Sequence, residues 1–145
     1  MSEIGQIDKN LQVNGSVQGE ALAFYNVRNS PFVVYGLLPG KPGDPFRRLP
    51  LSLAEQVNEG VLRLHRHTAG GRIRFATDSD CVAIRAIMPD KHCMSHMPFL
   101  GSSGFDLYEQ ESDNYTYRGS FIPAMDRGDV FEAIVRFDEA KKRDL

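Results

Sequence analysis

The sequence predicts an all-β fold: an antiparallel β-sandwich, jelly-roll-like, with one short helical insertion. Short segments rich in β-branched and aromatic residues recur about every ten residues and are separated by turn signals. Strands and helical patterns do not alternate, which disfavours a parallel, doubly wound sheet. The 145 residues are 41% hydrophobic and 25% charged. We therefore expect one β-sandwich domain over residues 1–145.

The first third of the chain predicts three strands and one long loop. Apolar residues alternate loosely over 11–17, which permits an edge strand. Residues 22–27 and 32–38 are rich in β-branched and aromatic side chains, with a turn signal between them. Residues 39–45 contain several prolines, which exclude a regular helix or central strand.

The helical insertion is predicted between 52 and 67. Ser52 and Glu55 have the spacing of a capping box, in which each side chain caps the other's backbone amide. The apolar residues that follow at helical spacing are Ala54, Val57, Val61 and Leu64. This pattern predicts one short helix or two single turns.

The second half of the chain predicts strands that alternate in polarity. Over 72–77, Ile73 and Phe75 face inward, whereas Arg72 and Arg74 share the opposite face. These two arginines would grip a carboxylate or phosphate, although a solvated, salt-bridged face is favoured. The strand predicted at 81–88 is expected to be buried on nearly both faces. At 104–109, Phe105 and Leu107 share one face of a strand, and Asp106 and Tyr108 share the other. Strands are also predicted at 115–121 and 130–137, before a charged end at 138–145.

Composition limits the partners and the location of the chain. The longest uninterrupted apolar stretch, 32–38, is too short to span a membrane. A formal net charge of −2 gives no electrostatic footprint for nucleic acid. The N-terminus has neither the basic nor the apolar region of a signal peptide. By default this predicts a cytoplasmic chain, or a secreted or periplasmic one if the chain is a trimmed form.

Cysteines and histidines are the candidate metal ligands. We expect Cys81 and Cys93 to be small buried hydrophobes, with a disulfide or a reactive thiol as alternatives. His65 and His67 have spacing suited to one metal on a strand, but the glutamate that a cupin site would add is missing, so ordinary surface histidines are favoured. We therefore expect no metal and no other cofactor.

The loop over 89–103 is the predicted functional edge, because its histidine, methionine and phenylalanine side chains suit a ligand rim or a contact surface. Within it, Ser102 or Ser103 is a conceivable nucleophile, with His92 or His96 as base. No Gly-x-Ser-x-Gly motif occurs, so a glycine-flanked turn is favoured. Three tyrosines would stack on sugar rings if exposed, although core packing is favoured for each: Tyr25, Tyr115 and Tyr117.

Four ordered segments resemble a known family. Residues 104–108, Gly-Phe-Asp-Leu-Tyr, resemble the namesake motif of the GxDLY domain, the N-terminal accessory domain of SGNH/GDSL-type hydrolases, which are esterase- or lipase-like. Residues 46–50 and 69–79 are similar to the family's Arg-Leu-Pro segment and its Arg-x-Arg-Phe strand and turn. Met97 and the Gly-Ser-Ser run at 101–103 match its Met-containing loop. The resemblance covers about residues 32–118.

The resemblance implies a non-catalytic, jelly-roll-like domain that positions substrate or docks an SGNH hydrolase domain, in cis or in trans, acting on a carbohydrate ester. The family's hydrolytic Gly-Asp-Ser block and later Asp-x-x-His are absent from this chain, so we assign it no catalytic residue. Further strands and a catalytic domain are expected beyond Leu145.

The candidate ligand or interdomain contacts are Arg48, His92, His96, Met97, Ser102 and Ser103. The motif residues are Gly104, Asp106, Leu107 and Tyr108; we expect Asp106 to bond a neighbouring loop beside Gly104, with Tyr108 covering that pair. The alternatives are a stand-alone carbohydrate-binding module, a self-associating module that forms a homo-oligomer, and a serine hydrolase using Ser102 or Ser103.

Overall fold

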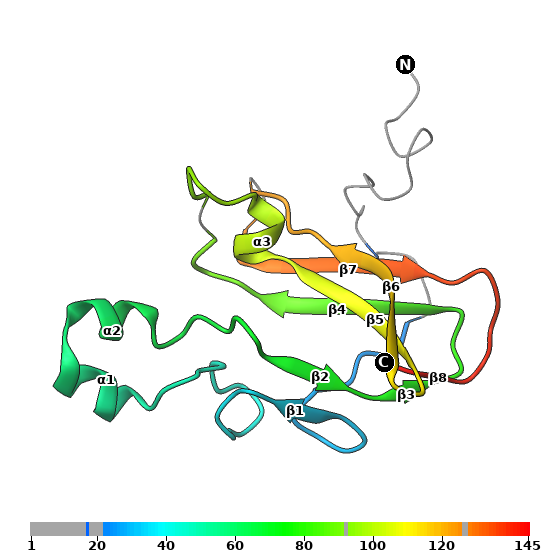
Figure 1. The fold of residues 1–145 in the computed structure, drawn as a ribbon, viewed down its shortest axis with the longest axis horizontal. Coiled ribbons are helices and arrows are strands. Elements are labelled where there is room, and N and C mark those ends of the chain that lie inside the picture. The colour runs from blue at the N-terminus through cyan, green and yellow to red at the C-terminus, as the bar shows by residue number, and fades with distance from the viewer. Residues whose placement is uncertain (1–16, 18–21, 92, 126–127) are drawn as a thin grey trace. The chain divides into compact units, whose positions relative to one another are not determined.

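The computed structural model describes residues 17, 22–91, 93–125 and 128–145. The predicted fold class is confirmed, because these residues form mostly antiparallel strands with a few short helices (Figure 1). The elements in chain order are β1 (Val33–Tyr35), α1 (Leu51–Val57), α2 (Glu59–Leu64), β2 (Arg72–Arg74), β3 (Ala76–Thr77), β4 (Cys81–Ile87), α3 (Phe99–Ser103), β5 (Phe105–Glu111), β6 (Asn114–Phe121), β7 (Val130–Arg136) and β8 (Arg143–Asp144).

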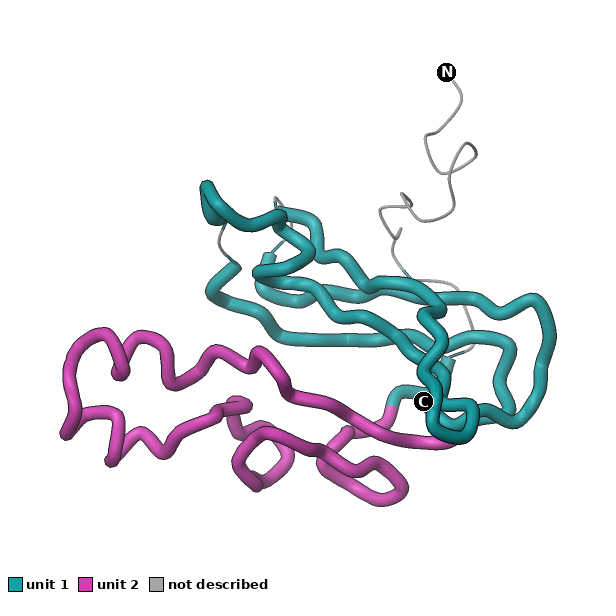
Figure 2. The backbone as a smooth tube through the Cα atoms, viewed as in Figure 1, with its two compact units in different colours: residues 1–24, 77–145 teal, residues 25–76 magenta. Residues whose placement is uncertain are grey.

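The chain divides into two compact units, coloured separately in Figure 2. Unit 1 combines residues 1–24 with 77–145, and unit 2 consists of residues 25–76. Unit 1 contains the ladders β4–β7 and β5–β6, and unit 2 contains the ladder β1–β2 and the helical insertion. β3 and β8 form a further short ladder.

The two long ladders of unit 1 are antiparallel and pack together through aromatic rings. In the first, Cys81 of β4 pairs with Arg136 of β7, and the register continues without interruption. In the second, β5 and β6 form a hairpin whose register shifts at Leu107/Tyr108, where a β-bulge lies. The ring of Phe105 stacks on that of Phe131 with centroids 6.4 Å apart, which joins the hairpin to β7.

Period-two alternation builds the core of unit 1. The most buried apolar side chains come from β5, β6 and β7: Leu107, Phe121, Phe131 and Ala133. The charged end adds Leu145 at 9% exposure, together with the guanidinium of Arg143, so this segment contributes to the core and to strand β8. The composition of the segment alone did not predict that role.

Unit 2 contains two short helices, which is the two-turn form of the predicted insertion. The predicted capping box is wrong: α1 begins after Pro50, and no side chain caps it. Proline suits a helix start because its φ is already fixed near the helical value. Instead, the side chain of Asn58 accepts a 2.9 Å hydrogen bond from the amide of Val61 and caps α2.

Three strand predictions need correction. The strand predicted over 72–77 is interrupted at Phe75, which lies between β2 and β3. Residues 22–27 form no strand, because the backbone turns at Asn26. The side-chain oxygen of Asn26 accepts a hydrogen bond from the Arg28 amide, and its backbone carbonyl accepts one from the Asn29 amide. Strand β4 is only half-buried: Arg85 points outward to an ion pair with Glu132, and Ile87 is 77% exposed. The edge strand predicted at 11–17 lies outside the described residues except for Val17, which is buried.

Candidate functional site

The Gly-Phe-Asp-Leu-Tyr motif begins where α3 meets β5, and its glycine is required by a close approach. A Cβ atom on Gly104 would lie 2.3 Å from Cδ1 of Leu100 and 2.7 Å from the Leu100 carbonyl oxygen. The Gly104 amide donates a 2.9 Å hydrogen bond to that same carbonyl, which ends α3. Only glycine permits this tight junction between helix and strand.

The motif residues then alternate between the two faces of β5, as the sequence predicted. Leu107 points into the core and is 7% exposed, whereas Asp106 and Tyr108 point outward. Asp106 accepts a 2.5 Å hydrogen bond from the hydroxyl of Ser120, which is its direct partner on β6. The expected partner in a neighbouring loop is therefore wrong, because the hairpin register brings a strand residue to this carboxylate.

The outward face of the hairpin gathers three tyrosines. The rings of Tyr108 and Tyr117 pack edge to face with centroids 5.7 Å apart, and the Tyr117 hydroxyl lies 2.8 Å from the Ser120 hydroxyl. Tyr115 extends the face and is 57% exposed. Core packing was the favoured expectation for Tyr115, Tyr117 and Tyr25, and it is wrong, since all three are exposed.

The loop predicted as the functional edge contains more regular structure than expected. Residues 99–103 form α3 rather than a turn, and a β-bridge joins Met94 to Met97. His96 and Met97 are exposed on this segment. His92 lies outside the described residues.

The two serines of α3 have structural surroundings. The Ser102 hydroxyl donates a 3.0 Å hydrogen bond to the Phe99 carbonyl, one turn earlier in the helix. Ser103 is only 7% exposed. A nucleophile for ester hydrolysis must be reachable by a carbonyl carbon, which the burial of Ser103 opposes.

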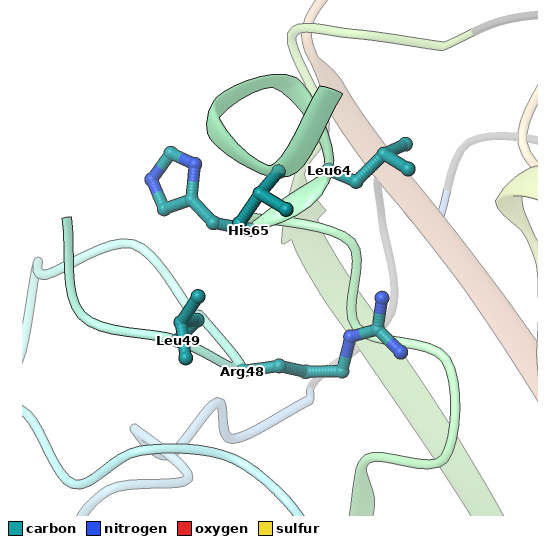
Figure 3. Close-up of a pocket in the computed structure, with 5 residues that line it drawn as sticks. Arg48, Leu49, Leu64 and His65 are labelled. Carbon is teal, nitrogen blue, oxygen red and sulfur yellow. The ribbon is translucent and has the colours of Figure 1, made fainter. Parts of the chain in front are cut away.

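Arg48 belongs to unit 2, where it borders an open pocket of about 290 Å³ (Figure 3). The pocket is lined by Arg48, Leu49, Val61, Leu64 and His65. The Arg48 amide donates a 3.1 Å hydrogen bond to the His65 carbonyl, which fixes the loop against the end of α2. The guanidinium of Arg48 and the imidazole of His65 point in opposite directions in Figure 3.

The imidazole of His65 is buried, and only one of its two ring nitrogens forms a hydrogen bond. Its Nδ1 lies 2.5 Å from the Leu62 carbonyl, which can only accept, so Nδ1 carries the proton and donates. Its Nε2 has no hydrogen-bond partner. The favoured expectation of an ordinary surface histidine is therefore wrong for His65, which is only 7% exposed, and its helical spacing to Leu62 was the available signal for this packing role.

A buried ion cluster in unit 1 was not predicted. The carboxylate of Glu109 lies 2.7 Å from the Arg118 guanidinium and 3.5 Å from Nε of Arg143, and Glu109 is only 4% exposed. Arg143 also covers the ring of Phe137 at 4.1 Å and donates to backbone carbonyls of the charged end. Arg143 is far from Glu109 in sequence, so no local pattern signals the pair.

The remaining candidate groups give no metal site in the part of the chain that the structure describes, where no three His, Cys, Asp or Glu side chains gather. Cys81 and Cys93 are both free thiols. Cys93 is exposed, so the expectation of a buried hydrophobe is wrong for it. Among the described residues, no helix is long and apolar enough to cross a membrane.

Comparison with known proteins identifies the family. A family model described as GxDLY, the N-terminus of SGNH-hydrolase-type esterases, matches residues 22–144. A solved structure described as a GDSL-like lipase from Bacteroides ovatus has a similar fold, with a TM-score of 0.66 at 20% identity. The match covers 77% of this chain and 32% of that one, so this chain spans about a third of that protein's length. No match was found among curated proteins. The chain belongs to the GxDLY family, whose members form the N-terminus of SGNH-type esterases.

Proposed function

We propose that this chain is a non-catalytic accessory domain that docks onto an SGNH hydrolase domain in cis. The observation that carries the proposal is an exposed apolar surface on the helical insertion of a chain whose family is the N-terminus of such enzymes. We name it the helical apolar surface. Its side chains are between 38% and 54% exposed: Leu51, Leu53, Val57, Leu62 and Leu64.

The helical apolar surface has the chemistry of a lasting protein interface. Five large aliphatic side chains on adjacent short helices leave much apolar area in water, which is unfavourable by about 25 cal/mol per Å². Large apolar side chains that remain exposed together on two adjacent short helices favour a surface that a partner covers. A hydrolase domain joined to the same chain is the partner that the family description supports.

The proposal assigns the chemical step to the hydrolase domain. The α3 serines support this division, since Ser103 is buried and the Ser102 hydroxyl bonds the helix backbone. The reaction class that follows is ester hydrolysis by a serine of the partner domain. A carbohydrate ester is the substrate class that we propose for the whole enzyme.

Ester hydrolysis by the isolated chain tests the non-catalytic part. The purified 145-residue chain and its Ser102→Ala/Ser103→Ala double variant are compared with a short chromogenic acetate ester. We expect no turnover above buffer for either. Turnover that is lost in the double variant would show that this chain has its own nucleophile and would overturn the proposal.

Binding to a separately produced SGNH hydrolase domain tests the docking part. Val57→Gln removes apolar area from the helical apolar surface, and Val130→Gln is a matched control in unit 1, because the two valines are 54% and 55% exposed. We expect the first to weaken binding about tenfold, or about 1.4 kcal/mol, and the second to leave it unchanged. Equal affinity for both variants would contradict the assignment of this surface.

Light scattering of the chain alone separates docking from self-association. If the helical apolar surface pairs two copies of this chain, the wild type is a dimer and Val57→Gln is a monomer. If the wild type is a monomer at high concentration, this supports a different domain as the partner that covers the helical apolar surface.

A further inference from the structure

A second exposed surface, on the β5–β6 hairpin, has a different composition. The register places three cross-strand pairs on the outward face: Asp106 with Ser120, Tyr108 with Tyr117, and Gln110 with Tyr115. A polar pair is thus followed by an aromatic pair and then by a mixed one. We call this surface the tyrosine face, and at about 3.4 Å per residue it extends about 14 Å along β5.

The three rings of the tyrosine face are exposed, and contacts hold two of them, Tyr108 and Tyr117, in place. Tyr108, Tyr115 and Tyr117 are 45%, 57% and 48% exposed. The edge-to-face contact between Tyr108 and Tyr117 limits the motion of both rings, and the Tyr117 hydroxyl is within 2.8 Å of the Ser120 hydroxyl. A ligand that stacks on rings fixed in this way loses less entropy than one that must order them.

The polar groups beside the rings argue against a lasting apolar interface. Asp106 lies beside the aromatic pair, and one of its carboxylate oxygens accepts a hydrogen bond from the Ser120 hydroxyl. An ionised carboxylate has about four acceptor sites, so it retains capacity for hydroxyl donors. Burial of this charge under an apolar protein surface would be costly, and charged residues are depleted at the centre of protein interfaces.

We propose that the tyrosine face binds an extended, β-linked pyranose chain. A pyranose ring offers a C–H face that stacks on a tyrosine ring and a rim of hydroxyls that donate to a carboxylate. A β-1,4-linked glucan or xylan is an extended chain, which matches rings displayed along a strand, whereas an α-1,4-linked glucan coils away from such a surface. The inference rests on the hairpin of unit 1 and is independent of the helical apolar surface in unit 2.

Calorimetric titration with cellohexaose and xylohexaose tests the proposal, with maltohexaose as the α-linked comparison. The chain has no tryptophan, so its tyrosine emission provides a second readout. We expect at least one β-linked hexasaccharide to bind and maltohexaose to bind at least about tenfold more weakly, a difference of about 1.4 kcal/mol. No heat and no emission change with either β-linked sugar at millimolar concentration would overturn the proposal.

Variants locate the binding surface. Tyr115→Ala is expected to weaken binding about tenfold, whereas Tyr115→Phe retains the ring and most of the affinity. Tyr25→Ala is the matched control, because this tyrosine is 70% exposed in unit 2. Unchanged affinity in Tyr115→Ala, or equal losses in Tyr115→Ala and Tyr25→Ala, would place the sugar elsewhere. If Tyr115→Ala weakens binding of the hydrolase domain instead, the face is a protein interface and the proposal fails.

Discussion

Unit 1 and unit 2 differ in where they place their apolar side chains. Unit 1 buries Leu107, Phe121 and Phe131 between its two ladders, and it adds an ion cluster around Glu109. Among the described residues of unit 2, only Ala54 and His65 are buried, whereas the leucines of its helices are exposed. One unit thus has a core of its own, whereas the other presents apolar area to its surroundings.

The difference shows that strand alternation and helix pairing bury area with different efficiency. Two facing ladders cover each other's inward side chains, so every second residue of a strand enters the core. Two helices of seven and six residues make less than two full turns each and cover little of one another. A unit built from such helices needs a partner domain to cover its apolar side chains, so its surface favours lasting docking. The tyrosine face of the hairpin belongs to a unit with its own core, and it favours reversible binding.

The largest effect is expected from Glu109→Gln in unit 1. The variant leaves the guanidinium of Arg143 buried without a counter-charge, which typically costs about 3–5 kcal/mol. Urea unfolding measures the loss. Glu111→Gln is the control: this side chain is 56% exposed and also pairs with Arg118, so its loss should stay below about 1 kcal/mol. Equal losses for the two variants would refute a buried cluster.

The next effect tests the core directly. Leu107→Ala should reduce the free energy of unfolding by about 2–5 kcal/mol, because it leaves a cavity in the core of unit 1. Leu53→Ala in unit 2 should cost less than about 1 kcal/mol, since this side chain is 47% exposed. Thermal unfolding of both variants provides the measurement. A larger loss for Leu53→Ala would reverse the contrast between the units.

The motif glycine is expected to give an intermediate effect. Gly104→Ala places a Cβ against the Leu100 carbonyl and should destabilise the chain by about 1–3 kcal/mol through overpacking. Gly128→Ala serves as control because a Cβ there meets nothing within 4 Å. Chemical denaturation compares the two. A neutral Gly104→Ala would mean that α3 shifts freely and does not hold the start of β5.

The smallest effect separates the observed helix cap from the predicted one. Asn58→Ala removes the cap of α2 and should cost about 1 kcal/mol, whereas Ser52→Ala should change stability by less than about 0.5 kcal/mol. Hydrogen exchange at the amides of α1 and α2 reports the effect of each variant on its own helix, even if unit 2 opens separately from unit 1. Faster exchange of the α1 amides in Ser52→Ala than in the wild type would support the predicted capping box.

The candidate site was only partly predictable. Alternation in the motif correctly placed Leu107 inward and Asp106 outward, because strand geometry sends successive side chains to opposite faces. The partner of Asp106 was not predictable, since it depends on the hairpin register and on the bulge at Leu107/Tyr108. The exposure of Tyr115 was missed for a similar reason. An aromatic residue in a strand is expected in the core, and only the tertiary structure shows which of the two strand faces packs against the core.

The sequence by itself determined the all-β class, the main strands after residue 72, the helical insertion and the family resemblance. These depend on local patterns of polarity, turn residues and short motifs, which each segment carries alone. Only the tertiary structure decided that Glu109 meets Arg143 and that three tyrosines share one exposed face. Each of these depends on register or on contacts between residues distant in sequence, and no local pattern encodes such distances.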